Sequence, residues 1–524
     1  MPDTPDVPDT GRAPDEATQA EVTAFLLAAA AKGGALVTPI ETHGAVVVLA
    51  GADVYKMKRA VRLPFMDLST LARRRVACER EVEINATFAP SLYLGTVAVV
   101  RRPDGSLSLG GEGTPVEWLV HMRRFDETLT FDRIADRGAF DPGLLESTAA
   151  VISAAHARAP VRREADFAAH LRDVVEENGA TLLAIGDPLD SARLERLDGN
   201  TRRALEAVAL LLRQRASAGY VRRCHADLHL RNITLVDGRP TLFDALEFDE
   251  DLATIDVLYD LAFLVMDLLL RDRAQEGNLI FNRTLAEARD EAGLPGVAAM
   301  PLFIAVRATI RAKIEAVRQQ QTGDVRFRVT AERYLELAEA ALRPVAPRLV
   351  AIGGLSGSGK SSVTSLLAAH LGRLPGAVHL RSDVERKSLL RAGEFERLPE
   401  SAYDPAVTET VYGVLYRKAE TVLRAGLSVV IDAVHQQESE RRAVAAVAAR
   451  LGVGFEGIWL DAPAATLEDR VAGRRGDASD ADRRVVAEQV ARDRGDIGWH
   501  RVDAARSLEV VVADAARRLG VDGP

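Results

Sequence analysis

The 524-residue chain has little cysteine, no long apolar run and no excess of positive charge. Its two cysteines, Cys78 and Cys224, are too few for a disulfide framework or a cysteine metal cluster. No stretch of 18 or more apolar residues occurs, which argues against a membrane-spanning helix. The net charge is −9, and residues 348–524 hold 25 basic and 25 acidic residues, so the chain shows no electrostatic footprint for nucleic acid. These absences predict a cytoplasmic protein.

The apolar content, 47%, is enough for several buried cores. Residues 1–17 are acidic and proline-rich and lack the basic start and apolar segment of a signal peptide, so we expect a disordered leader. Strand patterns and one helix at 69–88, followed by a mostly helical stretch, predict a first domain at 18–343. Two prolines predict a linker at 344–348, before a second domain at 349–520.

A glycine-rich loop opens the second domain. An apolar run at 349–352 leads into a full match to G-x-x-x-x-G-K-[ST], made of Gly354, Leu355, Ser356, Gly357, Ser358, Gly359, Lys360 and Ser361, with Ser362 next. A helical pattern follows at 363–371. Backbone N–H groups of such a loop surround phosphate oxygens, and the helix adds its positive N-terminal end. We expect Lys360 to reach the β- and γ-phosphates and Ser361 to hold Mg²⁺.

Strands and helices alternate after this loop, which predicts a parallel sheet with helices on both faces. Asp383 follows one predicted strand and Asp432 ends another, so both carboxylates face the edge where such sheets bind ligands. Asp383 is a candidate base for a substrate hydroxyl, with Arg386 as a substrate contact, although Ser382 or Asp383 is also suited to cap a helix. Asp432 is a candidate Mg²⁺ or substrate ligand.

Arg470 and Arg474 are four residues apart and share one helical face, beside Arg475. Mobile arginines that close over a triphosphate stabilise its transition state; solvated surface arginines are the alternative. The segment 477–480 is expected to cap the next helix.

A second set of polar residues lies at 225–249. Phosphoryl transfer needs a carboxylate near the attacking hydroxyl and oxygen ligands for Mg²⁺. Asp227 is the candidate base, and Asn232 and Asp244 are candidate metal ligands. The alternative is a polar loop in which Asp227 and Asn232 make only turn hydrogen bonds.

The segment HADLHLRN at 225–232 resembles the H-G-D-x-H-x-x-N loop of the aminoglycoside-phosphotransferase-like branch of the protein-kinase fold, and FDALEFD at 243–249 resembles its metal-binding segment. The resemblance covers residues 20–340. It implies that Lys56 or Lys58 pairs with Glu79 or Glu81 to steady ATP, and Lys56 fits the strand motif better. Glu247, Asp249 and Asp256 bind substrate or orient the loop in this interpretation. Two features depart from the family pattern: Ala226 replaces glycine, and only Thr42-His43-Gly44 is available in place of a glycine-rich phosphate loop.

Residues 348–519 resemble the small-molecule P-loop kinases, which include gluconate kinase, zeta toxin, chloramphenicol phosphotransferase and polynucleotide kinase domains. The D-x-x-R of Asp383 and Arg386 carries this likeness. The whole chain, including residues 54–85, resembles a bacterial bifunctional family that fuses both domains. The resemblance implies an α+β kinase-like bilobal domain, an α/β P-loop domain with a parallel sheet, and the cofactors ATP and Mg²⁺.

Three functions follow as hypotheses. The first is a phosphotransferase with two nucleotide sites that acts on a hydroxyl of a small-molecule acceptor. The second makes the first domain a sensor that regulates the P-loop domain. The third is a polynucleotide or RNA-end kinase, against which the balanced charge of residues 348–524 argues. The sequence indicates no oligomeric state.

Overall fold

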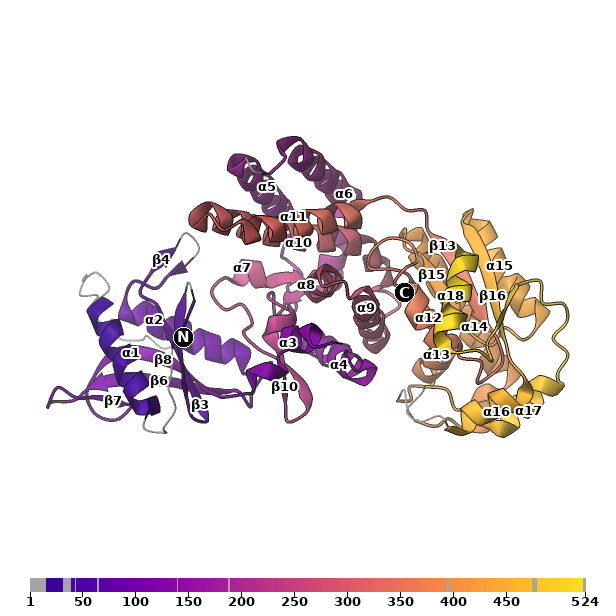
Figure 1. Cartoon of the computed structure of the whole chain (residues 1–524), viewed down its shortest axis with the longest axis horizontal. Coiled ribbons are helices and arrows are strands. Elements are labelled where there is room, and N and C mark those ends of the chain that lie inside the picture. The colour runs from indigo at the N-terminus through magenta and orange to yellow at the C-terminus, as the bar shows by residue number, and fades with distance from the viewer. Residues whose placement is uncertain are drawn as a thin grey trace. The chain divides into compact units, whose positions relative to one another are not determined.

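A computed structural model of the chain describes residues 16–31, 39–42, 44–63, 66–138, 140–186, 189–393, 396–473 and 478–521. These residues form two compact units, described separately below. The first unit combines residues 1–139 with 222–255, and the second combines residues 140–221 with 256–524. Figure 1 follows the elements along the chain from indigo to yellow. The helical part of the expected first domain is thus grouped with the P-loop part, and the boundary at 344–348 stays a prediction.

A six-stranded antiparallel sheet is the frame of the first unit. Its strand order is β1-β2-β3-β8-β6-β7, with β1 (Ile40–Glu41), β2 (Ala45–Ala50), β3 (Asp53–Lys58), β6 (Tyr93–Arg101), β7 (Leu107–Leu109) and β8 (Thr114–Arg123). A short hairpin, β4 (Arg62–Leu63) with β5 (Met66–Asp67), follows β3. The strand patterns expected from the sequence are therefore confirmed.

Alternation along β3 separates its side chains between two cores. Met57 packs in a core with Val22 and Leu26 of α1 (Glu16–Ala31). Val54 packs in the other core with Cys78 of α2 (Leu71–Asn85). Lys56 and Lys58 have the same parity as Val54, so the strand presents both lysines toward α2.

The remaining elements of the first unit are short. They are η1 (Glu127–Leu129), α3 (Phe131–Asp136), η2 (Leu230–Asn232), the antiparallel hairpin β10 (Ile233–Val236) and β11 (Arg239–Leu242), and α7 (Glu250–Ala253). Strands β9 (Val221–Arg223) and β12 (Thr254–Asp256) run across the residues where one unit passes into the other.

The second unit begins with a helical part. Its helices are α4 (Pro142–Arg158), α5 (Phe167–Ile185), α6 (Ser191–Ala218), α8 (Val257–Leu270), α9 (Ala274–Ala288), η3 (Leu294–Ala299), α10 (Met300–Thr322) and α11 (Val325–Leu342). Helix α8 is apolar nearly all round and largely buried, as expected for a helix in the middle of a bundle. Among the described helices, none combines the length and the apolar character needed to span a bilayer.

A five-stranded parallel sheet forms the rest of the second unit. Its order is β14-β15-β13-β16-β17, with β13 (Arg348–Gly353), β14 (Val378–Arg381), β15 (Val429–Asp432), β16 (Gly454–Asp461) and β17 (His500–Asp503). The accompanying helices are α12 (Lys360–Ala368), α13 (Ser382–Leu389), η4 (Glu400–Tyr403), α14 (Pro405–Arg424), α15 (Glu438–Leu451), α16 (Ala464–Gly473), α17 (Arg483–Ala491) and α18 (Leu508–Leu519). The predicted α/β class with a parallel sheet is confirmed.

Three boundaries differ from the sequence expectations. Helix α1 begins at Glu16, inside the expected leader, whose first 15 residues lie outside the described part. Arg381 is the N-cap position of α13, so neither Ser382 nor Asp383 caps that helix. Asp482 caps α17, because its side chain accepts from the Val485 N–H; the expected cap at 477–480 is therefore wrong.

Candidate functional site

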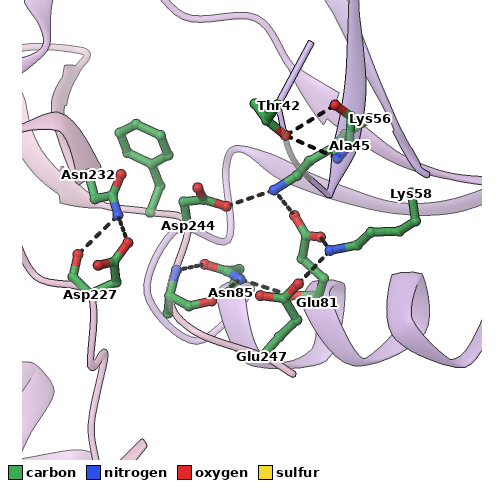
Figure 2. Close-up of polar contacts among 12 residues, drawn as sticks. Thr42, Ala45, Lys56, Lys58, Glu81, Asn85, Asp227, Asn232, Asp244 and Glu247 are labelled. Carbon is green, nitrogen blue, oxygen red and sulfur yellow. Dashed lines mark hydrogen bonds and ion pairs between the residues drawn. The ribbon is translucent and has the colours of Figure 1, made fainter. Parts of the chain in front are cut away.

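The lysine pair of β3 meets one buried glutamate. Glu81 is fully buried in α2, and its two oxygens lie 2.9 Å from Lys56 Nζ and 2.5 Å from Lys58 Nζ. Glu79, the alternative partner, pairs instead with Arg75 one turn earlier and remains largely exposed. The structure thus brings both candidate lysines to Glu81, as Figure 2 shows.

Two more carboxylates complete this cluster. Asp244 Oδ1 accepts from Lys56 Nζ at 2.8 Å, and Glu247 forms an ion pair with Lys58. Burial alone would lower the pKa of Lys56, but Asp244 and Glu81 outweigh it and hold that pKa well above its usual value. Burial opposes ionisation of Asp244, yet Lys56 brings the pKa of its carboxyl down to about 2. Lys56 and Asp244 are therefore both charged near neutral pH.

Side chains of α2 and β6 hold the segment that carries Asp244. The buried Asn85 side chain donates to the Ala245 carbonyl at 3.3 Å and accepts from the Ala245 N–H at 2.7 Å. The Asp244 N–H donates to the Tyr93 hydroxyl at 3.2 Å. Sequence reasoning missed Asn85, although it lies four residues after Glu81 and so on the same helical face.

The loop at 225–232 places its two candidate residues together. Asn232 Nδ2 donates to Asp227 Oδ2 at 2.8 Å and to the Asp227 carbonyl at 3.0 Å. His225 Nε2 donates to the Phe243 carbonyl at 2.9 Å, which ties the loop to the strand end before Asp244. In Figure 2, Asp244 lies between the Asp227–Asn232 pair and the lysines. The turn hydrogen bonds of the alternative interpretation are present, and they also orient Asp227.

Ala226 takes a backbone conformation that favours glycine. Its φ is 68° and its methyl group is buried. A non-glycine residue in this left-handed region costs about 1–2 kcal/mol. The loop therefore carries local strain at Ala226. At the other end of the site, Thr42 Oγ1 accepts from the Ala45 N–H at 3.0 Å, while His43 lies outside the described residues.

The other acidic residues of this region have local partners. Glu247 pairs with Lys58, and Asp249 caps α7 by accepting from the N–H groups of Asp251 and Leu252. In the second unit, Asp256 caps α8 and forms a buried ion pair with Arg215 at 2.6 Å. These contacts favour orientation of the chain over substrate binding for all three residues.

The P-loop of the second unit lies between β13 and α12. Gly357 has a φ of 85°, and a Cβ there would come within 2.6 Å of the Leu467 carbonyl oxygen, so a larger residue does not fit. Gly359 has a φ of 87° and occupies the N-cap position of α12. The loop is therefore followed directly by a helix N-terminus, the arrangement that binds phosphate. Lys360 begins that helix, and its Nζ donates to the Leu355 carbonyl at 3.1 Å; Ser362 lies in its first turn.

Ser361 and Asp432 converge at the ends of α12 and β15. Ser361 Oγ donates to Asp432 Oδ2 at 2.6 Å, and Arg381 Nη2 donates to Ser361 Oγ at 3.2 Å. His379 Nε2 lies 3.6 Å from the same Asp432 oxygen. Burial opposes the charge of Asp432, but His379 and Lys360 hold the pKa of its carboxyl well below the usual range. The sequence predicted Ser361 and Asp432 but not Arg381 or His379.

Asp383 lies in the first turn of α13, where burial raises the pKa of its carboxyl. Ser479 hydrogen-bonds its side chain. Arg386 Nη1 donates to the Ala402 carbonyl at 2.7 Å, and its guanidinium lies 4.8 Å from the Tyr403 ring centroid. Arg386 is thus engaged with η4, and its substrate contact stays a prediction.

The side chain of this region that contacts the P-loop is not one of the arginines predicted from the sequence. Arg470 is exposed and donates to the Ala504 carbonyl at 2.8 Å, whereas Arg474 and Arg475 lie outside the described residues. Gln489 of α17 accepts from the Ser356 N–H at 2.9 Å, directly on the P-loop. Asp480 accepts from Tyr403 Oη at 2.8 Å and pairs with Lys387 at 3.3 Å. No sequence pattern pointed to Gln489, and the segment that contains Asp480 was expected only to cap a helix.

Both sites offer the oxygen ligands that Mg²⁺ prefers. In the second unit these are Ser361 Oγ and the Asp432 carboxylate, already in contact. In the first unit, Asp244 keeps 43% of its side chain exposed while Lys56 holds one oxygen, and Asn232 contributes an amide oxygen. The residues present therefore fit a magnesium ion at each site.

A family model described as AAA domain matches residues 349–494. The uncharacterized proteins Rv2004c of Mycobacterium tuberculosis and Mb2027c of Mycobacterium bovis are each 32% identical to the chain over 483 residues, which is 91% of this chain and 94% of theirs. The chain belongs to the family of these mycobacterial proteins.

Solved structures also resemble parts of this family member. A choline/ethanolamine kinase family protein from Mesorhizobium loti is 16% identical, with a TM-score of 0.39, and the match covers 62% of this chain and 95% of that one. A gluconokinase from Sinorhizobium meliloti is 22% identical, with a TM-score of 0.25, covering 34% of this chain and 94% of that one.

Two groups of residues suited to phosphoryl transfer thus occur in one chain. The first unit holds the lysine–glutamate pair with Asp227, Asn232 and Asp244, and the second holds the P-loop with Asp432 and Asp383. The first group lies beside the six-stranded antiparallel sheet, and the second lies at the five-stranded parallel sheet.

Proposed function

We propose that the protein is a Mg²⁺-dependent phosphotransferase with two ATP sites, each of which transfers phosphate to a hydroxyl of a small-molecule acceptor. The observation that carries this proposal is the presence of two sets of phosphate, metal and base residues, each assembled within one unit. Phosphoryl transfer demands positioning and charge stabilisation more than covalent chemistry, and each set supplies both.

At the P-loop site, the backbone N–H groups of residues 357–361 and Lys360 bind the triphosphate. Asp383 orients the acceptor hydroxyl and takes its proton, since its raised pKa brings it closer to the working pH of a general base. Arg381 adds positive charge beside Ser361 and Asp432, where negative charge on the transferred group needs stabilisation.

At the first site, Lys56 contacts the ATP phosphates while Glu81 fixes its position. Asp227 orients the acceptor hydroxyl, and Asn232 fixes the Asp227 side chain. A magnesium ion at either site would screen the charge on the transferred phosphoryl group. Asp244 and Asn232 would hold it in the first unit, and Ser361 and Asp432 in the second.

Calorimetric titration with Mg²⁺ and a non-hydrolysable ATP analogue tests the two sites. The full chain is compared with Lys360→Ala, Asp244→Ala and the control Asp104→Ala, which changes an exposed turn between β6 and β7. We expect two binding events in the wild type and the control, and one event in each site variant. A single event abolished by Lys360→Ala, and unaffected by Asp244→Ala, would remove the first site from the proposal.

The second candidate function is a nucleotide-independent sensor in the first unit that regulates the P-loop site. The strained Ala226 and the direct Lys56–Asp244 ion pair favour it, because ATP and Mg²⁺ must compete with that pair. Ala226→Gly relieves the strain and restores the family residue. If this variant gains ATP affinity at the first site while the wild type has none, the sensor is a weakened kinase site.

A further inference from the structure

Strand β14 is the edge strand of the parallel sheet, yet its outer side is occupied. Strand β15 pairs with only one side of β14. On that side, the Val378 N–H donates to the Ser428 carbonyl. Because hydrogen-bonding groups alternate along a strand, the Ala377 carbonyl and the His379 N–H point to the other side. Such unpaired edges invite pairing with another chain unless the fold covers them.

Two asparagines of α9 meet these outward groups. Asn282 Oδ1 accepts from the His379 N–H at 2.7 Å, and Asn282 Nδ2 donates to the Ala377 carbonyl at 3.1 Å. Asn278 Nδ2 donates to the Ala377 and Pro375 carbonyls at 3.1 and 3.0 Å. One side-chain amide thus makes the two hydrogen bonds that a neighbouring strand would make.

Both asparagine side chains are buried, so the groups that they contact have little access to water. Asn278 is 2% exposed and Asn282 is 9% exposed. Loss of the Asn282 side chain leaves the His379 N–H without this buried partner, and loss of the Asn278 side chain does the same to the Pro375 carbonyl. At Gly376, a Cβ would come within 2.8 Å of Asn278 Nδ2, so the chain approaches α9 closely here. Helix α9 and residues 375–379 therefore pack closely against each other within the second unit.

Residues 375–379, which α9 holds by hydrogen bonds, lead along the chain into the P-loop site. His379 has its N–H on Asn282 and its imidazole 3.6 Å from Asp432. Arg381, two residues on, contacts Ser361, and Asp383 follows in α13. Beyond the end of α13, the Ala392 carbonyl accepts from Nη2 of Arg289 at 2.8 Å. Arg289 is the C-cap residue of α9. Contacts from α9 therefore hold both ends of residues 377–392.

We propose that Asn278 and Asn282 are positioning residues for the P-loop site, because they fix β14 and so place Arg381 and Asp383 for transfer. Helix α9 then helps to set the geometry of that site, although it lies far upstream of the P-loop in sequence. The catalytic part of this inference rests on the proposed function; the structural part does not.

The first test measures amide hydrogen exchange in the wild-type full chain. The His379 N–H, which points away from β15, should be as protected as the Leu380 N–H, which points toward it, although no strand of the described residues pairs with β14 on the His379 side. In Asn282→Leu, which keeps similar volume, exchange at His379 should rise about tenfold or more, as expected for loss of one buried hydrogen bond. The control Asn200→Leu changes an exposed asparagine of α6 and should leave residues 375–383 unchanged. Rapid exchange at His379 in the wild type would overturn the proposal, even if the variant fails to fold.

The second test measures Mg²⁺·ATP hydrolysis with water as the acceptor, in an Asp244→Asn background that silences the first site. We expect Asn282→Leu to lower kcat about tenfold while the KM for ATP changes less than twofold, because the P-loop itself is on β13 and α12. The milder Asn278→Ala should show the same split with a smaller effect. An unchanged kcat beside raised exchange would make the asparagines merely structural and overturn their positioning role. Hydrolysis that Lys360→Ala does not reduce would instead refute the P-loop part of the proposed function.

Discussion

Glu81 allows the sharpest test of the first site, since Glu79 on the same helix provides a matched control. Glu81→Gln removes the charge from a fully buried side chain that contacts two lysines. Removing one partner from a buried ion pair costs about 3–5 kcal/mol. Lys56 keeps Asp244 and Lys58 keeps Glu247, so we expect a loss near the lower limit, about 3 kcal/mol. Glu79→Gln breaks only an exposed pair with Arg75 and should cost less than about 1 kcal/mol.

The assay is urea unfolding followed by pulsed hydrogen exchange of peptides from β3 and α2, which reports the first unit alone. With a urea dependence of about 1–3 kcal/mol per molar, Glu81→Gln should lower the midpoint by about 1–3 M. Burial opposes the charge of Glu81, but Lys56 and Lys58 lower the pKa of its carboxyl. A lowered pKa contributes stability above the unfolded value and loses it as pH falls through the folded one, so the difference between wild type and variant should shrink at acid pH. Equal midpoints for the two variants at neutral pH would refute the charge cluster.

Three further predictions concern the individual sites. Asp383→Asn should lower phosphate transfer at the P-loop site by about 10²–10⁴-fold, with ATP-analogue binding unchanged. Because the base must lose its proton, wild-type kcat/KM should rise with pH through a midpoint above the ordinary aspartate pKa. A flat pH profile would count against Asp383 as the base. Ser361→Ala should weaken the dependence of ATP-analogue binding on Mg²⁺ in calorimetry, whereas Ser365→Ala, later in α12, should not; equal effects would remove Ser361 as a metal ligand. Asn85→Leu should destabilise the first unit by about 1–3 kcal/mol in the same urea assay, because the Ala245 N–H and carbonyl lose their partner; hydrogen exchange at Ala245 that stays slow would contradict this role.

Local sequence patterns predicted much of the chemistry. The P-loop could be recognised because its glycines, lysine and serine are contiguous, so their spacing alone defines the phosphate loop and the helix that follows. The loop at 225–232 is also contiguous, and its Asp227–Asn232 pair forms across five residues. Lys56 and Lys58 share one face of β3 because side chains alternate along a strand.

Partners brought from distant segments could not be predicted in this way. The choice between Glu79 and Glu81 depends on which face of α2 packs on the sheet, and the periodicity of one charged helix left both open. Gln489 contacts the P-loop from 133 residues downstream, and Asp480 contacts Lys387 from 93 residues downstream, with no spacing rule to mark either of them. The departure at Ala226 was visible in the sequence, but its left-handed backbone was not.

The amino-acid sequence by itself determined the two folds, the P-loop, and the identity of most candidate bases and metal ligands, because those features depend on short-range periodicity and contiguous spacing. Only the tertiary structure decided that Glu81 serves both lysines, that Asn85 holds the Asp244 segment, and that Asn278 and Asn282 close the edge of β14. Each of these contacts joins residues from separate elements, and the geometry of packing, which no local pattern encodes, determines which side chains meet.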